Sequence, residues 1–89
     1  MAIIKKKIWP EYFELVQAGK KQFELRVADF EIKEGDTLIL EEYDPIKKEY
    51  TGRTIEKQAK YILKFKLDDF GQKELIEEHG FYVIGINDN

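Results

Sequence analysis

Short strand-like stretches recur along this chain, and they constrain its fold more than any other feature. They cover residues 2–8, 22–27, 37–43, about 50–65 and 81–86 of an 89-residue chain. The stretch 22–27 alternates polar and apolar residues cleanly, a period typical of strands that bury one face, and Leu38 and Leu40 face one side of the stretch 37–43. A chain of this length has room for one core, and so we expect residues 1–89 to form a single domain.

Five or six strands of this length cannot bury both faces of a flat sheet in so few residues. Closure into a small barrel would remove the exposed strand edges. The residues from Pro10 onward have apolar side chains at helical spacing, and Gly19 suits the end of a helix. We therefore predict an α+β fold: a small β-barrel of mostly antiparallel strands, capped by a helix over 10–18, with a short helix over 73–80 before the last strand.

Turn residues separate the predicted strands. Residues 33–36 read KEGD and predict a turn into the strand that follows. Asp44 and Pro45 open a hairpin whose second arm begins near Tyr50. Gly52 lies inside this arm and predicts a bulge, because glycine allows backbone conformations that other residues avoid.

Composition and charge argue against several classes of function. The chain has no cysteine and one histidine, so it lacks a disulfide framework, a thiol nucleophile and the usual zinc ligands, and we expect no metal or other cofactor. Its net charge of −3 argues against strong binding to duplex DNA through a broad cationic face. No apolar run is long enough to span a bilayer, and cations follow the first few residues too soon for a secretory signal. We expect a cytoplasmic protein.

The stretch GKKQFELR, residues 19–26, combines cations and an acid next to the predicted helix end. In an extended segment Glu24 and Arg26 point to the same side. An arginine binds a phosphate or the acceptor edge of a base with two hydrogen bonds, and a glutamate accepts from an exocyclic amine such as that of cytosine. Lys20 and Lys21 can neutralise a phosphate, and a lysine can also act as a nucleophile or base. The alternative is a surface ion pair, which contributes only about 0–1 kcal/mol.

The stretch YTGR is the second candidate for the site. Tyr50 can stack on a base, and Gly52 permits a close approach of the backbone. Arg53 can bind a phosphate. The alternative for this stretch is a bulged strand with an exposed arginine.

The residues Gly19 to Arg26 fit the pattern G-x-K-x-x-E-x-R, and the chain resembles the ASCH (activating signal cointegrator homology) domain family. The stretches PEYF, FELR, EEYD and YTGR are similar to those of a short bacterial, archaeal and phage subgroup. The resemblance covers nearly the whole chain. It implies a PUA-like β-barrel that recognises RNA or nucleotides in a cleft lined by the charged residues of the motif.

The resemblance also implies a second function. Some small members of that family are amidohydrolases that deacetylate N4-acetylcytidine with a lysine, a threonine and a later acid. Lys21 corresponds to that lysine, whereas Glu24 stands in place of the threonine. The later acid is left open among Asp68, Asp69 and Glu74.

We therefore predict a module that binds unpaired nucleotides, either single-stranded RNA or free nucleotides. The predicted binding residues are Lys20, Lys21, Glu24, Arg26, Tyr50 and Arg53. Lys21, Arg26 and Arg53 would meet phosphates, Glu24 would read a base edge, and Tyr50 would stack. The alternative is an amidohydrolase with Lys21 as the reactive group and Glu24 orienting it or a water. RNA cleavage and a role as a protein-interaction domain are weaker alternatives.

Overall fold

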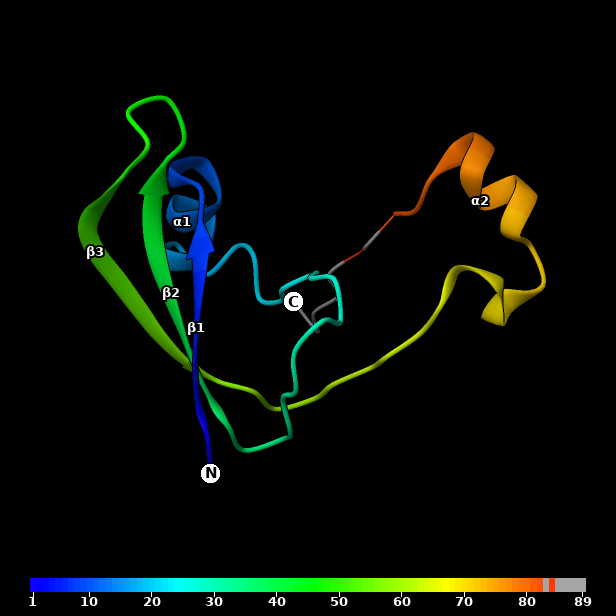
Figure 1. Ribbon diagram of the computed structural model, residues 1–89, viewed down its shortest axis with the longest axis horizontal. Helices are drawn as coiled ribbons and strands as arrows, with labels where there is room; N and C mark the ends of the chain where they lie inside the picture. The colour runs from blue at the N-terminus through cyan, green and yellow to red at the C-terminus, as the bar shows by residue number, and fades with distance from the viewer. Residues whose placement is uncertain (83, 85–89) are drawn as a thin grey trace.

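In a computed structural model, which describes residues 1–82 and 84, the chain forms a small α+β fold around an open sheet (Figure 1). The elements in chain order are β1 (Ile3–Ile8), α1 (Pro10–Gln17), β2 (Thr37–Asp44), β3 (Glu49–Gln58), the single-turn helix η1 (Leu67–Phe70) and α2 (Lys73–His79). The strands of the described residues lie in the order β1-β2-β3.

The central strand β2 pairs in opposite senses with its two neighbours. β1 and β2 are parallel, with Ile3 opposite Thr37 and Ile8 opposite Glu42. A parallel pair needs a crossover connection, and α1 with the long loop after it supplies one. β2 and β3 form an antiparallel hairpin through the predicted turn at Asp44.

The core lies between α1 and one face of the sheet. Its buried apolar residues are Ile8, Phe13, Val16 and Leu40, with Leu38 and Ile55 packed against them. Burial of each such side chain contributes roughly 1.5–3 kcal/mol relative to exposure. α1 begins at Pro10, as predicted, and ends one residue before Ala18; Gly19 then turns the chain with a φ of +77°. The helix therefore covers a sheet face and does not cap a barrel.

The predicted turn over 33–36 is confirmed, and hydrogen bonds of its last residue, Asp36, hold it in place. The main-chain N–H of Asp36 donates to the carbonyl of Lys33 at 3.0 Å. Its buried carboxylate accepts from the main-chain N–H groups of Ala2 at 3.0 Å and Lys33 at 2.8 Å. These two hydrogen bonds lower the pKa of Asp36 below its ordinary value of 3.8. The carboxylate thus fixes the start of β2 beside the start of the chain.

The prediction of a closed, mostly antiparallel barrel is wrong, because the sheet is open and half of its pairing is parallel. The stretch 22–27 is one reason, since it forms no strand. Phe23, Leu25 and Val27 are 39%, 61% and 80% exposed, so its apolar side is not buried in a barrel. Alternation of polar and apolar residues indicates an extended segment. Such a segment belongs to a sheet only if it pairs with another strand.

The second arm of the hairpin is shorter than predicted. Gln58 lies opposite Thr37, the first residue of β2, so a longer β3 would have no partner there. Ala59 instead binds the turn: it donates to the carbonyl of Asp36 at 2.8 Å and accepts from the N–H of Gly35 at 2.7 Å. The predicted strand to residue 65 is therefore wrong beyond Gln58.

The C-terminal part contains the predicted short helix, α2, and the described residues after it form no strand. Of the stretch 81–86, residues 81, 82 and 84 lie in no strand, and 83, 85 and 86 fall outside the described residues. The rings of Phe65, Phe70 and Phe81 meet edge to face, with centroids 5.5–6.3 Å apart. α2 lies well apart from the sheet (Figure 1). No helix in residues 1–82 is long and apolar enough to cross a membrane.

Candidate functional site

Two cationic side chains of the motif converge on one carboxylate, that of Glu24. Oε1 of Glu24 lies 2.6 Å from Nζ of Lys21, and Oε2 lies 2.8 Å from Nη2 of Arg26. Nε of Arg26 also donates to Oε2 at 2.9 Å. The side chains of Lys21 and Glu24 are 16% exposed and that of Arg26 is 29% exposed. We call Lys21, Glu24 and Arg26 the motif cluster.

The segment that carries the cluster is held by its own side chains and by the end of α1. The main-chain N–H of Lys21 donates to the carbonyl of Leu15 at 3.1 Å, so the loop starts from a fixed point. Nζ of Lys21 also donates to the carbonyl of Phe23 at 2.8 Å. The side chain of Gln22 donates to the carbonyl of Gly19 at 2.9 Å. These bonds curl the segment, which explains why the motif is a loop and not a strand.

Arg26 ties this loop to the sheet. Its Nη2 donates to the main-chain carbonyl of Lys7 at 2.7 Å. Within the described residues β1 is an edge strand, so a carbonyl that points away from β2 needs another donor. Arg26 supplies that donor and places the motif cluster beside the edge of β1.

The ammonium group of Lys7 lies beside a pair of tyrosine rings. Tyr43 and Tyr50 are opposite each other on β2 and β3, with ring centroids 5.2 Å apart and planes at 77°. Nζ of Lys7 lies 4.2 Å from the centroid of Tyr43 and 5.6 Å from that of Tyr50. Lys7 and Tyr43 alternate with the buried residues Ile8 and Glu42, so they point to the face away from α1. We call Tyr43 and Tyr50 the tyrosine pair.

A bulge on β3 creates a second polar network on the α1 side. Glu41 pairs with Thr54 and Tyr43 pairs with Tyr50, which leaves residues 51–53 opposite the single residue Glu42. Gly52 has a φ of +93°, as the predicted bulge requires. The bulge turns both Thr51 and Arg53 toward Glu42.

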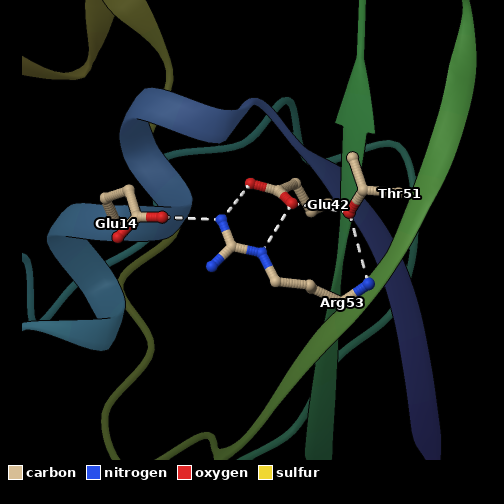
Figure 2. A network of polar contacts seen from close by, with 4 residues as sticks. All are labelled: Glu14, Glu42, Thr51 and Arg53. Atoms are coloured by element: carbon tan, nitrogen blue, oxygen red, sulfur yellow. Dashed lines mark hydrogen bonds and ion pairs between the residues drawn. The ribbon is translucent and has the colours of Figure 1, made fainter.

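Glu42 is the centre of this network (Figure 2). Arg53 donates to its two oxygens at 2.9 and 2.7 Å, and the Thr51 hydroxyl donates at 2.5 Å. Arg53 also binds Glu14 of α1 at 2.6 Å and lies 4.5 Å from the ring centre of Phe13. The hydrogen bonds from Arg53 and then Thr51 lower the pKa of Glu42, and those to Glu42 and Glu14 raise the pKa of Arg53. The network joins α1 to both β2 and β3.

The structure thus divides the residues predicted for the site. Lys21, Glu24 and Arg26 lie together, Lys20 is exposed beside them, and Tyr50 is linked to Arg26 through Lys7. Arg53 lies on the other side of the sheet, where its Nε binds Glu42 and its Nη2 binds both Glu42 and Glu14.

Sequence reasoning missed Glu14 and Glu42. A signal for Glu42 was present, since it continues the alternation of Leu38 and Leu40. An acid on the core face of a strand needs a buried partner.

The candidates for a later catalytic acid are elsewhere. Asp68 and Asp69 belong to η1 and Glu74 to α2, and in the described residues no hydrogen bond or ion pair joins them to the motif cluster. A shallow, mainly apolar hollow lies at α2 and is lined by residues that include Phe70, Leu75 and His79. None of the residues predicted for the site lines it. Across residues 1–82 and 84, no three His, Asp or Glu side chains gather as metal ligands would.

Comparison with known proteins places this chain in a family. A family model described as "Domain of unknown function (DUF3850)" matches residues 3–86. The "Uncharacterized 12.9 kDa protein in GpA 3'region" of Escherichia phage P2 is 44% identical to this chain over 50 residues. That match covers 56% of this chain and 44% of the phage protein, so the chain spans less than half the length of this relative. The resemblance to ASCH domains stays a prediction.

Proposed function

The chain belongs to the DUF3850 family of domains of unknown function, and we propose that its motif cluster binds an unpaired nucleotide, free or within a single strand. The phosphate is bound by Lys21 and Arg26, and the base edge is read by Glu24. The resemblance to ASCH domains implies the same class of ligand.

One observation carries this proposal: a single carboxylate holds a lysine and an arginine side by side. Two cations and one acid leave the cluster with a net positive charge on a chain whose total charge is −3. Glu24 already fixes the conformations of the Lys21 and Arg26 side chains. A phosphate that binds them therefore costs little further side-chain conformational entropy. Arg26 is the most exposed member: its Nε and Nη2 bind Glu24 and the carbonyl of Lys7, and within the described residues Nη1 makes no hydrogen bond, so Nη1 is the nitrogen that can reach a phosphate.

Glu24 allows the motif cluster to distinguish one base from another. A carboxylate accepts from the exocyclic amine of cytosine and finds no donor at the same position of uracil. Such an edge is free only in an unpaired base, which favours single-stranded ligands. Exposed Lys20 adds a cation beside the cluster. Arg53 has no role at the ligand in this proposal, because its bonds to Glu14 of α1 and to the buried Glu42 hold it on the α1 side of the sheet, away from the motif cluster.

A titration of the purified protein tests this function. Fluorescence anisotropy with labelled single-stranded RNA octamers should give saturable binding that weakens as salt is raised, because phosphates are neutralised by lysine and arginine. Arg26→Ala should remove most of it, whereas Lys64→Ala, an exposed lysine outside the cluster, should not. The absence of saturable binding to any of the octamers and to free nucleotides would overturn the proposal.

A second function is favoured by the 2.6 Å contact between Nζ of Lys21 and Oε1 of Glu24. We propose as the alternative the hydrolysis of N4-acetylcytidine. Glu24 takes a proton from water, the water oxygen bonds to the acetyl carbon, and the carbon–nitrogen bond breaks with a proton passing to the cytidine amine. Lys21 polarises the acetyl oxygen. Chromatography of N4-acetylcytidine after incubation should show cytidine and acetate, and an unchanged substrate at high protein concentration rejects this alternative.

A further inference from the structure

We infer that the tyrosine pair and Lys7 form a second subsite, which stacks one base of the same single strand whose phosphate the motif cluster binds. The ligand is then an oligonucleotide of at least two nucleotides. This inference rests on the proposed function, because it places the second subsite relative to the first.

Lys7 connects the two subsites. Its main-chain carbonyl lies in the plane of the sheet and accepts from Arg26 at 2.7 Å. Its side chain stands on the outer face, where Nζ lies 4.2 Å from the centre of the Tyr43 ring. The motif cluster therefore lies beyond the edge of β1, and the tyrosine pair lies on the adjoining outer face. A single nucleic-acid strand that contacts both subsites has to pass over the edge of β1 at Lys7.

The geometry of the rings suits stacking on Tyr50. Tyr50 is 52% exposed, and its ring is held by the edge-to-face contact with Tyr43 at 5.2 Å. The ammonium of Lys7 lies closer to Tyr43 than to Tyr50, so Tyr50 is the ring more open to a base. A held aromatic ring binds any base through its π-face.

The charges around the two subsites indicate which one binds the phosphate and which one binds the base. Glu41 lies opposite Lys7 on the same face, and Asp44 and Glu49 are paired at the end of the hairpin. Asp44 is engaged in the turn, where it accepts from the N–H groups of Ile46 and Lys47. Lys7, Lys47 and Lys48 offset the charges of Glu41, Asp44 and Glu49, so this end of the sheet has no net charge, whereas Lys21 and Arg26 with Glu24 leave the motif cluster net positive and attract a phosphate. The base therefore goes to Tyr50 and the phosphate to the motif cluster.

An affinity series with AMP, the dinucleotide ApA and tetraadenylate tests this inference by calorimetry. The affinity should rise about tenfold or more from AMP to tetraadenylate. Tyr50→Ala should remove this rise and leave AMP binding unchanged, and Tyr50→Phe should keep it. Tyr50→Leu, which retains an apolar side chain in the strand, should behave as Tyr50→Ala. Tyr61→Ala is the matched control, since Tyr61 is 77% exposed outside both sites.

The outcomes separate this inference from the proposed function. No binding of AMP or of any oligonucleotide by the unaltered protein would reject the proposed function itself. Binding of AMP with no rise along the series, or a rise that survives both Tyr50→Ala and Tyr50→Leu, would overturn the stacking subsite alone. The deoxyadenylate series should show the same rise, because stacking does not need the 2′-hydroxyl, and a rise confined to RNA would also contradict the inference.

Discussion

Arg26 donates to the main-chain carbonyl of Lys7 at 2.7 Å, and this bond joins the motif loop to the edge of the sheet. The same guanidinium binds Glu24, so it has both a structural partner and a partner within the cluster. A change at this position should therefore affect ligand binding more than the free energy of unfolding, since the core around Phe13 and Leu40 is elsewhere.

The first prediction compares two changes at Arg26. Arg26→Ala should weaken binding of a single-stranded RNA octamer about 10- to 100-fold, the loss expected for hydrogen bonds to a charged group. Arg26→Lys keeps the charge but not the planar fork, so it should recover only part of the affinity. Anisotropy measures both, and the urea midpoint should be nearly unchanged. Equal binding by Arg26→Lys and the unaltered protein would show that the positive charge alone, and not the guanidinium group, binds the phosphate.

The second prediction concerns Glu24→Gln. This change keeps the shape of the side chain but leaves Lys21 and Arg26 without a neutralising charge. Affinity for inorganic phosphate should increase, because Glu24 no longer competes for the two cations. Discrimination between cytidine and uridine nucleotides should fall by roughly 1–3 kcal/mol. Calorimetry measures both effects, and an unchanged preference for cytidine would show that Glu24 does not read the base.

The third prediction tests the packing of α1. Phe13 is 1% exposed, and Phe13→Ala should lower the free energy of unfolding by about 3–5 kcal/mol. Tyr12 precedes it on the same helix and is 46% exposed, so Tyr12→Ala should have a much smaller effect. Urea denaturation followed by circular dichroism measures both. Similar losses for the two variants would mean that α1 packs on the sheet through a different face.

The fourth prediction is a loss of stability in acid. The pKa values of Asp36 and Glu42 are lower in the folded protein than their ordinary values of 3.8 and 4.5. Their contribution is therefore complete above those ordinary values and is lost as the pH falls through the folded values, because the unfolded chain then binds more protons. The urea midpoint should fall over this range.

Two variants isolate the part that Glu42 plays in this loss. Glu42→Gln should be less stable than the unaltered protein at pH 7, and the difference should shrink in acid. Glu14→Gln is the matched control: it also removes a carboxylate bound to Arg53, but its side chain is 60% exposed, so the effect should be small. A constant difference at all pH values for Glu42→Gln would contradict the assigned cause.

Local features were predictable from the sequence where a single residue dictates the backbone. Pro10 and Gly19 mark the two ends of α1, the KEGD stretch forms its turn, and Gly52 lies in a bulge. Each depends on a conformation that nearby residues determine. The strands predicted over 2–8 and 37–43 from their local residue pattern are confirmed to within one residue as β1 and β2.

Pairing between strands was not predictable in this way. Alternation gives the face of a strand but neither its direction nor its partner, so the parallel pairing of β1 with β2 was missed. Residues 22–27 alternate as well as any strand, yet the bonds of Lys21 and Gln22 curl their start into a loop. The proximity of Glu24 and Arg26 was expected from their spacing and that of Lys21 from the resemblance, whereas their link to Lys7 depends on the tertiary fold.

Mapping the ligand onto the backbone tests the central claim most directly. In a nitrogen–proton correlation spectrum of the labelled protein, a saturating single-stranded RNA octamer should shift the amide signals of residues 21–26 and of Lys7 most, and leave those of α2 in place. Shifts confined to α2 and the hollow beside it, or no shifts at all, would contradict the claim that the motif cluster binds unpaired nucleotides.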